Sequence, residues 1–517
     1  MKKIFRALLV GAAVTLTISC QDFLDVNTNP NAPQVVTANL YLPPLLHWMT
    51  TSPLLDGRFV GRYTQNYTLT GLSLSSWDRM GYDAASDAGA QQWRDVYWTF
   101  GQNLVDMTNK AEAEQRWDLL GVAYVLKAWG WQVLADLHGE LPIKEAIDPS
   151  RTKFDYDTQE FAYTEVQRLL NKGIEMLART DGAVDQTYLG KTDKIYNGDR
   201  AKWTKLAYAM LALNLNHYSN KGSYKPADVI AAVDKSFIGN SDEPLLTYPN
   251  TQNDDINFLG RTRGNFNAYR QTQFVVGLLD GTQFGTPDPR LSRMMSPSPD
   301  GLYRGLDPNV VGFGALATAQ QPAPLYGSLT AGQPGRYVFD DKAKIAVMTY
   351  AEVQFIKAEA AYRMGDKALA LTAYRNGVSA HIDWVNSRNA DNSQAPTQIT
   401  AAEKTAFLAS TAVVPAAGIT LTNIMSQKYI AQWGWGHNET WMDLRRYHYT
   451  DIDPVGGKQI YPGYTPPTNL FPDNSAKVVE RIRPRYNSEY VWNRDALMVI
   501  GGLDLDYHTK RMWIIQP

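Results

Sequence analysis

A helix-pair repeat constrains the fold of this chain more than any other feature of its sequence. An apolar stripe at helical spacing runs along residues 117–137 and consists of Leu119, Ala123, Leu126, Gly130, Val133 and Leu137. The same segment matches W-x2-L-G-x2-Y, the start of a tetratricopeptide unit, with Trp117, Leu120, Gly121 and Tyr124. In that unit the glycine lets two helices approach and aromatic rings fill the space between them. A second such unit is expected at 358–374.

Further helices are expected where apolar residues recur at the same period. They cover about 158–178, 200–218, 226–233, 352–364, 366–376, 401–410, 422–433 and 438–446. Asp157 with Glu160, and Thr400 with Glu403, have the spacing of a capping box. Asn438 is expected to cap the last helix. The helical repeats therefore occupy about 91–238 and 349–446, and stacked repeats can bury one continuous core in so long a chain.

Two stretches break the helical pattern. Residues 244–334 hold ten of the 27 prolines, together with many Gly, Asn and Thr residues. Because proline interrupts helices, this stretch is predicted to be a loop-rich lobe inserted between the helical halves. Long loops on a rigid scaffold are where binding usually resides. The tail at 447–517 is also rich in proline and is predicted to be loop-rich.

The first twenty residues are typical of an export signal. Three positive residues stand near the start: Lys2, Lys3 and Arg6. The apolar stretch 7–18 is too short to span a bilayer as a helix but suits a signal peptide. Cys20, the single cysteine, ends a segment that resembles a bacterial lipobox, although Thr17 stands where leucine is usual. We expect residues 1–19 to be removed and Cys20 to carry the lipid that anchors the protein.

Composition limits the classes of partner. Loss of residues 1–19 moves the formal net charge from −2 to about −5, so no net basic field favours nucleic acid. The hydrophobic fraction of 44% and the charged fraction of 20% are those of a folded globular protein. Aromatic residues reach 11%, with 29 Tyr and 14 Trp. This surplus leaves rings for exposed stacking platforms, which sugar rings favour.

The sequence predicts no catalytic site, metal or cofactor. It contains no phosphate-binding or nucleophile-elbow glycine motif. His437 and Glu439 match the H-x-E of a zinc deaminase, but that chemistry needs cysteine ligands that this chain does not have. The adjacent Arg445 and Arg446 are expected to be structural and to pair within the helical core.

Four segments, in this order along the chain, resemble the SusD/RagB family of surface glycan-binding lipoproteins. The first is DFLDVNTNPNAP at 22–33. The helix at 350–360 is similar to the family pattern EA-x-L-I-x-AEA, and 427–446 is similar to E-R-x-x-E-L-x-x-E-G-x-R-x-x-D-L-R-R. Residues 483–493 are similar to the closing P-R-R-x-x-Y-P-x-x-E-x-x-x-N. The order of these segments carries the resemblance.

The resemblance implies an all-α fold in which four tetratricopeptide-like helix pairs pack against an irregular loop-rich region, as a single SusD-like domain over 20–517. It implies lipid anchoring at the cell surface of the outer membrane and a SusC-like TonB-dependent transporter as the partner. The expected function is to bind oligosaccharides and deliver them to that transporter, without catalysis. Two alternatives stay open: a helical-barrel glycoside hydrolase, which needs a pair of carboxylates, and a repeat protein that binds peptides or other proteins.

Sugar contacts are expected from aromatic and planar polar side chains in loops. The candidates are Trp77, Tyr82, Phe266, Tyr269, Arg270, Tyr303 and Tyr326. For each of them the alternative is packing inside the protein. Ligand residues vary within the family, so no motif assigns them here.

Overall fold

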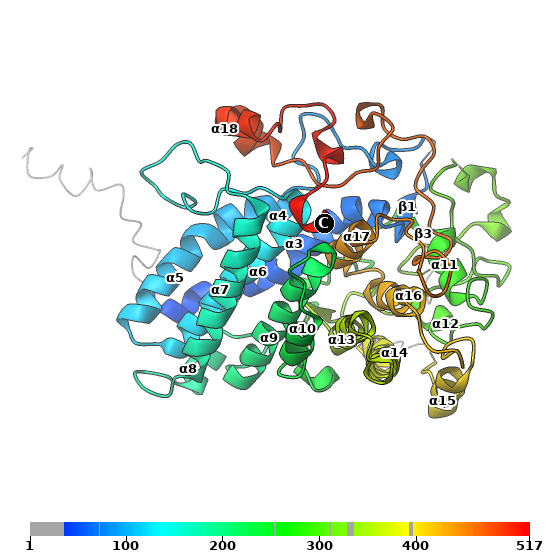
Figure 1. Ribbon diagram of the computed structural model, residues 1–517, viewed down its shortest axis with the longest axis horizontal. Helices are drawn as coiled ribbons and strands as arrows, with labels where there is room; N and C mark the ends of the chain where they lie inside the picture. Colours follow the sequence, from blue (N-terminus) through cyan, green and yellow to red (C-terminus); the bar gives the residue numbers. More distant parts are fainter. Residues whose placement is uncertain (1–35, 72, 253–254, 311, 328–334, 392–396) are drawn as a thin grey trace, which may run out of the picture.

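The computed structural model describes residues 36–517 except 72, 253–254, 311, 328–334 and 392–396. Helices dominate this part of the chain, and its strands are two or three residues long (Figure 1). The predicted all-α class is confirmed. Within the same residues no helix is long and apolar enough to cross a membrane. The predicted signal peptide, Cys20 and the segment at 22–33 lie outside the described residues.

The first helical group occupies the left of Figure 1. Its members are α3 (Leu42–Tyr63), α4 (Gln91–Arg94), the π-helical turn η3 (Asp95–Phe100), α5 (Gly101–Ala113), α6 (Trp117–His138), α7 (Gln159–Ala178), α8 (Gln186–Gly190), α9 (Arg200–His217) and α10 (Pro226–Val233). The predicted helices at 117–137, 158–178, 200–218 and 226–233 are confirmed. The sequence reading did not include α3, which carries Pro53 inside the helix.

Two glycines set the spacing of the α6 and α7 pair. A Cβ on Gly121 would lie 2.6 Å from Leu177 Cγ and 3.0 Å from Gly173 O, and a Cβ on Gly173 would lie 3.0 Å from Val125 Cγ2. Any side chain at these positions would push the two helices apart. The expected role of Gly121 in close helix approach is confirmed.

The second helical group extends from the centre of Figure 1, where α17 lies near α3, to the lower right. It consists of α13 (Tyr350–Met364), α14 (Lys367–Ala390), α15 (Ala401–Ala409), α16 (Leu421–Gln432) and α17 (His437–Arg446). The predicted helices are confirmed, but α14 continues well beyond 376. Gly377 does not end it, because a Cβ there would lie 2.9 Å from the Phe355 ring of α13. This glycine is another point of close helix approach.

The helix caps were predicted less well than the helices. Thr400 and Glu403 form the expected capping box at α15. Asp157 was wrong as the cap of α7, because Thr158 is the residue that accepts the backbone N–H there. Asn438 was also wrong, because it lies inside α17. At α7 the extended Thr158 is the N-cap, and at α17 Gly436 holds the N-cap position without a side-chain hydrogen bond.

Short elements fill the loop-rich regions. The lobe contains α11 (Gln273–Leu279) and α12 (Leu291–Met294), and the tail contains the π-helical turn η10 (Tyr486–Trp492) and α18 (Arg494–Val499). Two antiparallel pairings hold the lobe to the helices: β1 (Tyr67–Leu69) with β3 (Tyr269–Gln271), and β2 (Leu245–Leu246) with β4 (Ile345–Ala346). No helix in the described part of 244–334 exceeds seven residues, as the prolines predicted.

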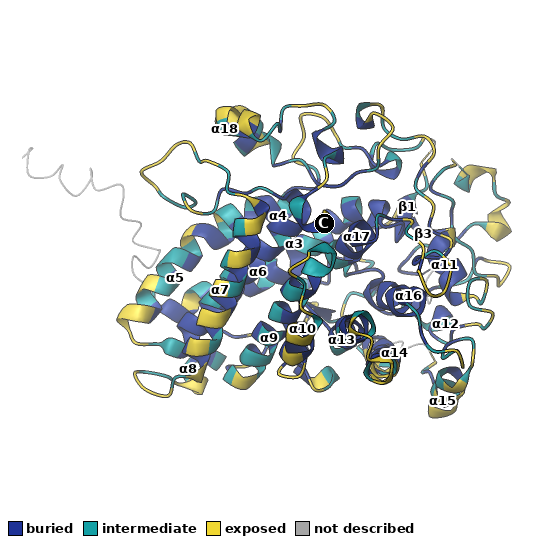
Figure 2. Cartoon of the chain, viewed as in Figure 1, coloured by how far each residue is buried: buried dark blue, intermediate teal, exposed yellow. Residues whose placement is uncertain are grey.

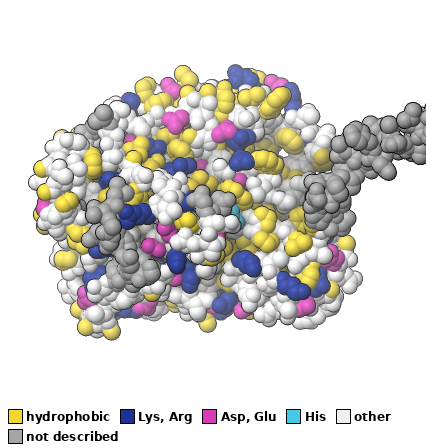
Figure 3. Space-filling view, turned by 180° about the vertical axis from the view of Figure 1, so that it is seen from behind, with side chains coloured by type: hydrophobic (Ala, Val, Ile, Leu, Met, Phe, Trp, Pro, Cys, Tyr) yellow, Lys and Arg dark blue, Asp and Glu magenta, His cyan; other side chains and the backbone are white. Residues whose placement is uncertain are grey.

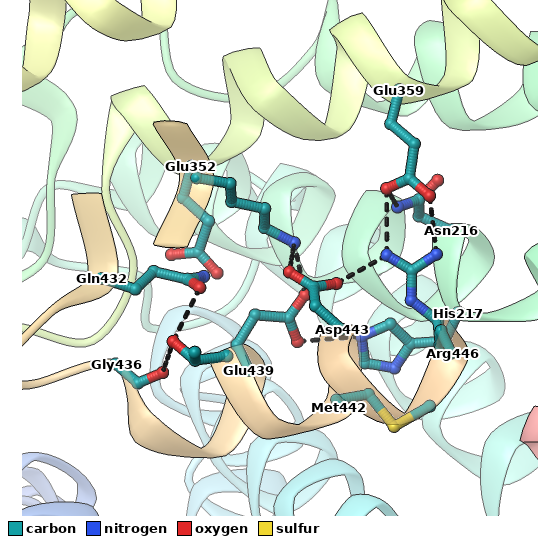
Figure 4. A network of polar contacts seen from close by, with 12 residues as sticks. Asn216, His217, Glu352, Glu359, Gln432, Gly436, Glu439, Met442, Asp443 and Arg446 are labelled. Atoms are coloured by element: carbon teal, nitrogen blue, oxygen red, sulfur yellow. Dashed lines mark hydrogen bonds and ion pairs between the residues drawn. The ribbon is translucent and has the colours of Figure 1, made fainter. Parts of the chain in front are cut away.

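The core runs without a break through both helical groups (Figure 2). The helix α16 lies at its centre, and all twelve of its residues are buried. Its Lys428 ammonium group therefore sits inside the protein, where it contacts Glu439 Oε1 at 2.6 Å and Asp443 Oδ2 at 2.8 Å (Figure 4). Opposite charges meet here because a buried charge is stable only when it is paired.

The network extends from α17 to α9 and α13 (Figure 4). His217 Nε2 of α9 lies 2.9 Å from Glu439 Oε2, and Arg446 of α17 binds Glu359 of α13. The neighbouring Arg445 donates to backbone carbonyl groups and packs on the Trp441 ring. Both arginines are buried in the core as expected, but within the described residues only Arg446 forms the expected ion pairs.

Candidate functional site

Two π-helical turns, far apart in the sequence, face the same surface cleft. The turn η3 joins α4 to α5, and η10 precedes α18. A π-helical turn carries an extra residue that disturbs helix packing, and such turns are frequent at functional sites. Their meeting at one cleft marks it as the candidate site.

The cleft, called the Trp98 cleft below, has a volume of about 480 Å³. Its walls come from η3, from the loop between α6 and α7, and from η10. The lining residues are Trp93, Arg94, Tyr97, Trp98, Gln102, Pro142, Ala146, Ile147, Asp148, Pro149, Arg151, Phe154, Arg485, Ser488, Glu489 and Asn493. Both the volume and the mixture of apolar walls with a few polar groups are those of a small-molecule site.

Trp98 gives the cleft an exposed aromatic surface. Its side chain is 67% exposed, and the guanidinium carbon of Arg94 lies 4.5 Å from the ring centroid. The two residues are one helical turn apart, so this cation–π contact forms within one helical segment and needs no residue from elsewhere in the chain. A flat apolar ring with a planar donor beside it can stack on a sugar ring and donate to its hydroxyl groups.

Aromatic rings, of which Trp93 is buried and Tyr97 half-buried, hold the floor of the cleft in place. Trp93 and Tyr97 have ring centroids 5.0 Å apart, and Tyr97 also contacts the Trp131 ring of α6 at 5.4 Å. The Tyr97 hydroxyl donates to Pro142 O at 2.8 Å. This contact fixes the loop after α6 against η3, so the cleft is formed before any ligand arrives.

Asn493 joins the two polar walls. Its Oδ1 accepts from Phe154 N at 3.0 Å, and its Nδ2 donates to Phe154 O at 2.9 Å and to Glu489 Oε2 at 2.9 Å. Arg485 forms a 2.6 Å ion pair with Asp87. The buried Ser488 hydroxyl has no hydrogen-bond partner among the described residues.

The carboxylates of the cleft are already bound by the protein. Glu489 Oε2 accepts from the Tyr156 hydroxyl at 2.6 Å as well as from Asn493. The hydroxyl and N–H groups of Ser150 hold the pKa of Asp148 below its ordinary value. A glycosidase needs the opposite, a carboxyl group whose pKa is raised so that it can act as an acid. Glu489 and Asp148 therefore both accept hydrogen bonds from the protein itself.

The face opposite to that of Figure 1 carries mixed charge. Figure 3 shows Lys and Arg side chains interspersed with Asp and Glu among apolar side chains. In the part of the chain that the structure describes, no three His, Cys, Asp or Glu residues form a group that could hold a metal ion.

The residues predicted as sugar contacts lie outside the Trp98 cleft. Phe266, Tyr269, Arg270 and Tyr326 cluster beside the β1–β3 pairing, where Phe266 and Tyr326 are 1% and 0% exposed. Arg270 donates to the carbonyl groups of Pro322, Asn267 and Tyr269. These interactions stabilise the lobe itself. Tyr303 is half-buried against the core.

Trp77 and Tyr82 lie together at a different cavity of about 200 Å³. Trp77 is 2% exposed and donates to Asp83 Oδ2 at 3.0 Å. Tyr82 donates to Asp473 Oδ2 at 2.7 Å, and the Arg483 guanidinium carbon lies 4.5 Å from its ring centroid. A ligand contact by any of the seven predicted residues stays a prediction.

The residues that build the Trp98 cleft were not identified from the sequence. Trp93, Tyr97 and Trp98 are close together, and an α-helix has room for the first two on one buried face, since they are four residues apart. The third ring then has to point elsewhere. That surplus of aromatic residues was the available signal for Trp98, whereas nothing in the sequence places Asn493 beside it.

Comparison with known proteins agrees with this architecture. A SusD homologue from Bacteroides fragilis superposes with a TM-score of 0.71 at 20% identity, over 93% of this chain and 100% of its own. A chitin-binding SusD homologue from Flavobacterium johnsoniae gives a TM-score of 0.70 at 18% identity, over 92% and 98%. A SusD/RagB family protein from Bacteroides thetaiotaomicron gives 0.68 at 20%, over 93% and 99%. Such identities show the fold alone.

The search of curated proteins gives no match. The family model described as "Starch-binding associating with outer membrane" matches residues 30–467, which include both helical groups, the loop-rich lobe and the η3 wall of the Trp98 cleft. This match extends over most of the chain, so the protein belongs to the SusD-like family.

Proposed function

We propose that this protein is a cell-surface lipoprotein that binds an oligosaccharide in the Trp98 cleft without cleaving it. It passes the oligosaccharide to a SusC-like TonB-dependent transporter. The family description, with its starch binding and outer-membrane association, supports this role. Two similar structures are named as chitin-binding, which supports a glycan as the ligand class.

The exposed Trp98 ring beside Arg94 is the observation that carries the proposal. Burying an exposed tryptophan face against a sugar ring removes apolar surface from water on both partners. The charged donors Arg94 and Arg485 lie at the same cleft, and Ser488 adds a hydroxyl without a partner. Such groups satisfy the hydroxyl groups that a bound sugar withdraws from water.

Affinity electrophoresis and calorimetry with a glycan panel that includes chitin and starch oligomers test the proposal. Trp98→Ala is expected to weaken binding by roughly five- to a hundredfold, taking as a guide the stacking of bases on aromatic side chains, on the order of 1–3 kcal/mol. Trp492→Ala is the matched control, because Trp492 is 72% exposed but does not line the cleft. If both variants bind the oligosaccharide equally well, the ligand does not contact Trp98.

The non-catalytic part of the proposal has its own test. Purified protein incubated with each bound oligomer should leave the chain length of that oligomer unchanged. Release of shorter products by the pure protein would instead favour the glycoside hydrolase alternative.

Anchoring and partner are tested in cells. Cys20→Ser should release the protein from membranes, and affinity purification of the native protein should recover a TonB-dependent transporter. A protein that stays on the membrane after the Cys20 substitution would contradict the lipid anchor. Purification without any transporter would contradict the delivery step and leave glycan binding standing.

A further inference from the structure

A second and larger cavity lies on the opposite side of the molecule from the Trp98 cleft. Its volume is about 820 Å³. Four segments meet there: the loop after α11, the turn between α13 and α14, the loop between α15 and α16, and the tail at 455–462. In Figure 1, α14, α15 and α16 lie at the lower right, whereas α18 lies at the upper left beside the Trp98 cleft. The cavity is called the Lys367 pocket below.

The charge of the Lys367 pocket has one sign. Lys367 and Lys458 line it, and no Asp or Glu is among the described residues that do. Neither lysine forms an ion pair within the described part of the chain, although many other lysines do. An ammonium group without a counter-ion at the wall of a cavity favours an anionic ligand.

The acidic residues nearest to the pocket are already engaged. Asp453 is buried, and its oxygens accept backbone N–H groups from Thr422, Val455 and Gly456. Asp366 caps α14 by accepting from Leu369 N. Their charges therefore stabilise local backbone, and neither carboxylate contacts the two lysines.

A buried donor at the same pocket has no acceptor. Tyr362 lines the pocket, and its hydroxyl is shielded from solvent without a hydrogen-bond partner in the described chain. Burial, together with the charge of Asp453, raises the pKa of Tyr362, so the hydroxyl keeps its proton at neutral pH. A buried donor without an acceptor is unfavourable, and an oxygen anion in the pocket would satisfy it.

Much of the remaining wall is apolar. Phe284, Leu371, Ile419 and Val455 face the cavity, and Val455 is 73% exposed. Uncharged polar side chains also line it: Gln283, Thr420, Thr422 and Asn423. Apolar surface next to three donors suits a molecule with an anionic group on one side and a ring with an apolar face on the other. The volume lies within the range of small-molecule sites.

We propose that the Lys367 pocket is a second ligand site, which binds a small organic carboxylate attached to a ring. The two lysines and the Tyr362 hydroxyl hold the carboxylate, and the ring packs on Phe284 and Leu371. A uronic acid sugar and an aromatic acid both have this chemistry. The pocket shares no residue with the Trp98 cleft, so this site stands independently of the proposed oligosaccharide capture.

Calorimetry on the purified protein distinguishes an acidic sugar from an aromatic acid as the ligand. The probes are trigalacturonate, its neutral counterpart galactotriose, and ferulate, each at 50 mM and at 500 mM NaCl. At least one of the two anions is expected to bind, and more weakly at high salt because salt screens the lysine charges. Binding by trigalacturonate alone identifies an acidic sugar, and binding by ferulate alone identifies an aromatic acid. Absence of binding by both anions overturns the proposal.

Substitutions locate the anion. The Lys367→Ala, Lys458→Ala double variant is expected to bind it at least about tenfold more weakly, because two charged contacts are lost. Tyr362→Phe is expected to bind several-fold more weakly. The matched control is the Lys191→Ala, Lys194→Ala double variant, which removes two exposed lysines elsewhere and should bind normally. Unchanged affinity in the Lys367, Lys458 variant overturns the proposal.

The two sites are separable in the same experiment. Trp98→Ala should leave binding of the anion unchanged, and the Lys367, Lys458 variant should leave binding of a neutral oligosaccharide unchanged. Loss of anion binding in Trp98→Ala would assign the anion to the Trp98 cleft and overturn the second site. Only variants whose unfolding midpoint equals that of the unmodified protein are compared, so that misfolding is not mistaken for loss of a contact.

Discussion

Arg446 and Glu359 form a two-bond ion pair with neither side chain exposed to solvent. Arg446 Nη1 lies 2.7 Å from Glu359 Oε1, and Nη2 lies 2.9 Å from Oε2. The pair joins α17 to α13, whose sequence positions are almost ninety residues apart. Both charges have lost their hydration, so removing one takes from the other its two-bond partner. Glu359 would keep only the weaker pair with Arg363 at 3.3 Å, and Arg446 would keep Asp443.

Arg446→Met should therefore destabilise the protein by about 3 kcal/mol or more. Urea unfolding followed by tryptophan fluorescence measures the change. The double variant Arg446→Met, Glu359→Leu should recover part of the loss, because it also removes the Glu359 carboxylate, which has lost its main partner. Glu175→Gln is the control, since it breaks an exposed pair with Lys172 and should cost less than about 1 kcal/mol. A cost for Arg446→Met as small as that of the control would contradict the buried-pair account.

His217 is expected to make stability depend on alkaline pH. Burial alone would lower its pKa, but the carboxylates of Glu439 and Asp136 outweigh burial and raise the pKa to about 9 from 6.5. Nε2 lies 2.9 Å from Glu439, and Nδ1 lies 3.4 Å from Asp136. The folded state therefore binds a proton that the unfolded state has lost. The stabilisation is complete below about 6.5 and disappears as the pH rises through about 9.

The urea midpoint of the protein should fall between pH 7 and pH 10, and it should fall less in His217→Gln. Nitrogen-proton correlation spectra of the imidazole give the pKa directly. A ring that is neutral at pH 7 would refute this account, whatever the unfolding data show.

Glu352 should also make stability fall as the pH rises, but over a lower pH range than His217. Burial, together with the charge of Glu439, raises its pKa to about 8 from 4.5. Its ionised form is disfavoured in the folded state, so stability decreases as the pH rises from about 4.5 to about 8. Glu352→Gln keeps the oxygen that accepts from Thr349 N and cannot ionise. It should raise the urea midpoint at pH 9 and change it little at pH 4; an equal shift at both pH values would point to packing instead.

The helices were predictable because their information is local. The stripe from Leu119 to Leu137 predicted α6 almost to its ends, since every residue of the pattern lies within one helix. Gly377 shows the limit of such reasoning. Within the sequence it resembles a helix end, and only the Phe355 ring of another helix explains why α14 passes through it. The close approach of two helices cannot be read from the sequence of either helix alone.

The sites were less predictable because their residues come from distant segments. The candidate aromatic residues were chosen for being in loops, but Trp77, Phe266 and Tyr326 are buried, because these loops pack into the same core as the helices. Trp98 lies in a helical segment, so it was not among the candidates from loops. The π-helical turn η3 that surrounds it has no sequence signature, so its effect on side-chain direction was visible only in the structure.

Asn493 gives a prediction for the Trp98 cleft that does not alter its aromatic surface. Its amide connects the η10 wall to Phe154 in the loop after α6 through two hydrogen bonds, and a third holds Glu489. Asn493→Ala should weaken oligosaccharide binding, because the two walls of the cleft are then no longer joined. Binding must then fix both walls in place, which costs conformational entropy. The lost buried hydrogen bonds should cost about 1–3 kcal/mol of stability.

Hydrogen exchange separates this effect from a general loss of structure. In Asn493→Ala, amide exchange should accelerate at 149–156 and 485–493 and stay unchanged in α13 and α14, which lie elsewhere in the fold. Asn487→Ala is the matched control, because Asn487 lies in the same turn with an exposed side chain. If Asn493→Ala binds the oligosaccharide as tightly as Asn487→Ala does, the walls are held by other contacts, and the Arg485–Asp87 ion pair becomes the brace to test next.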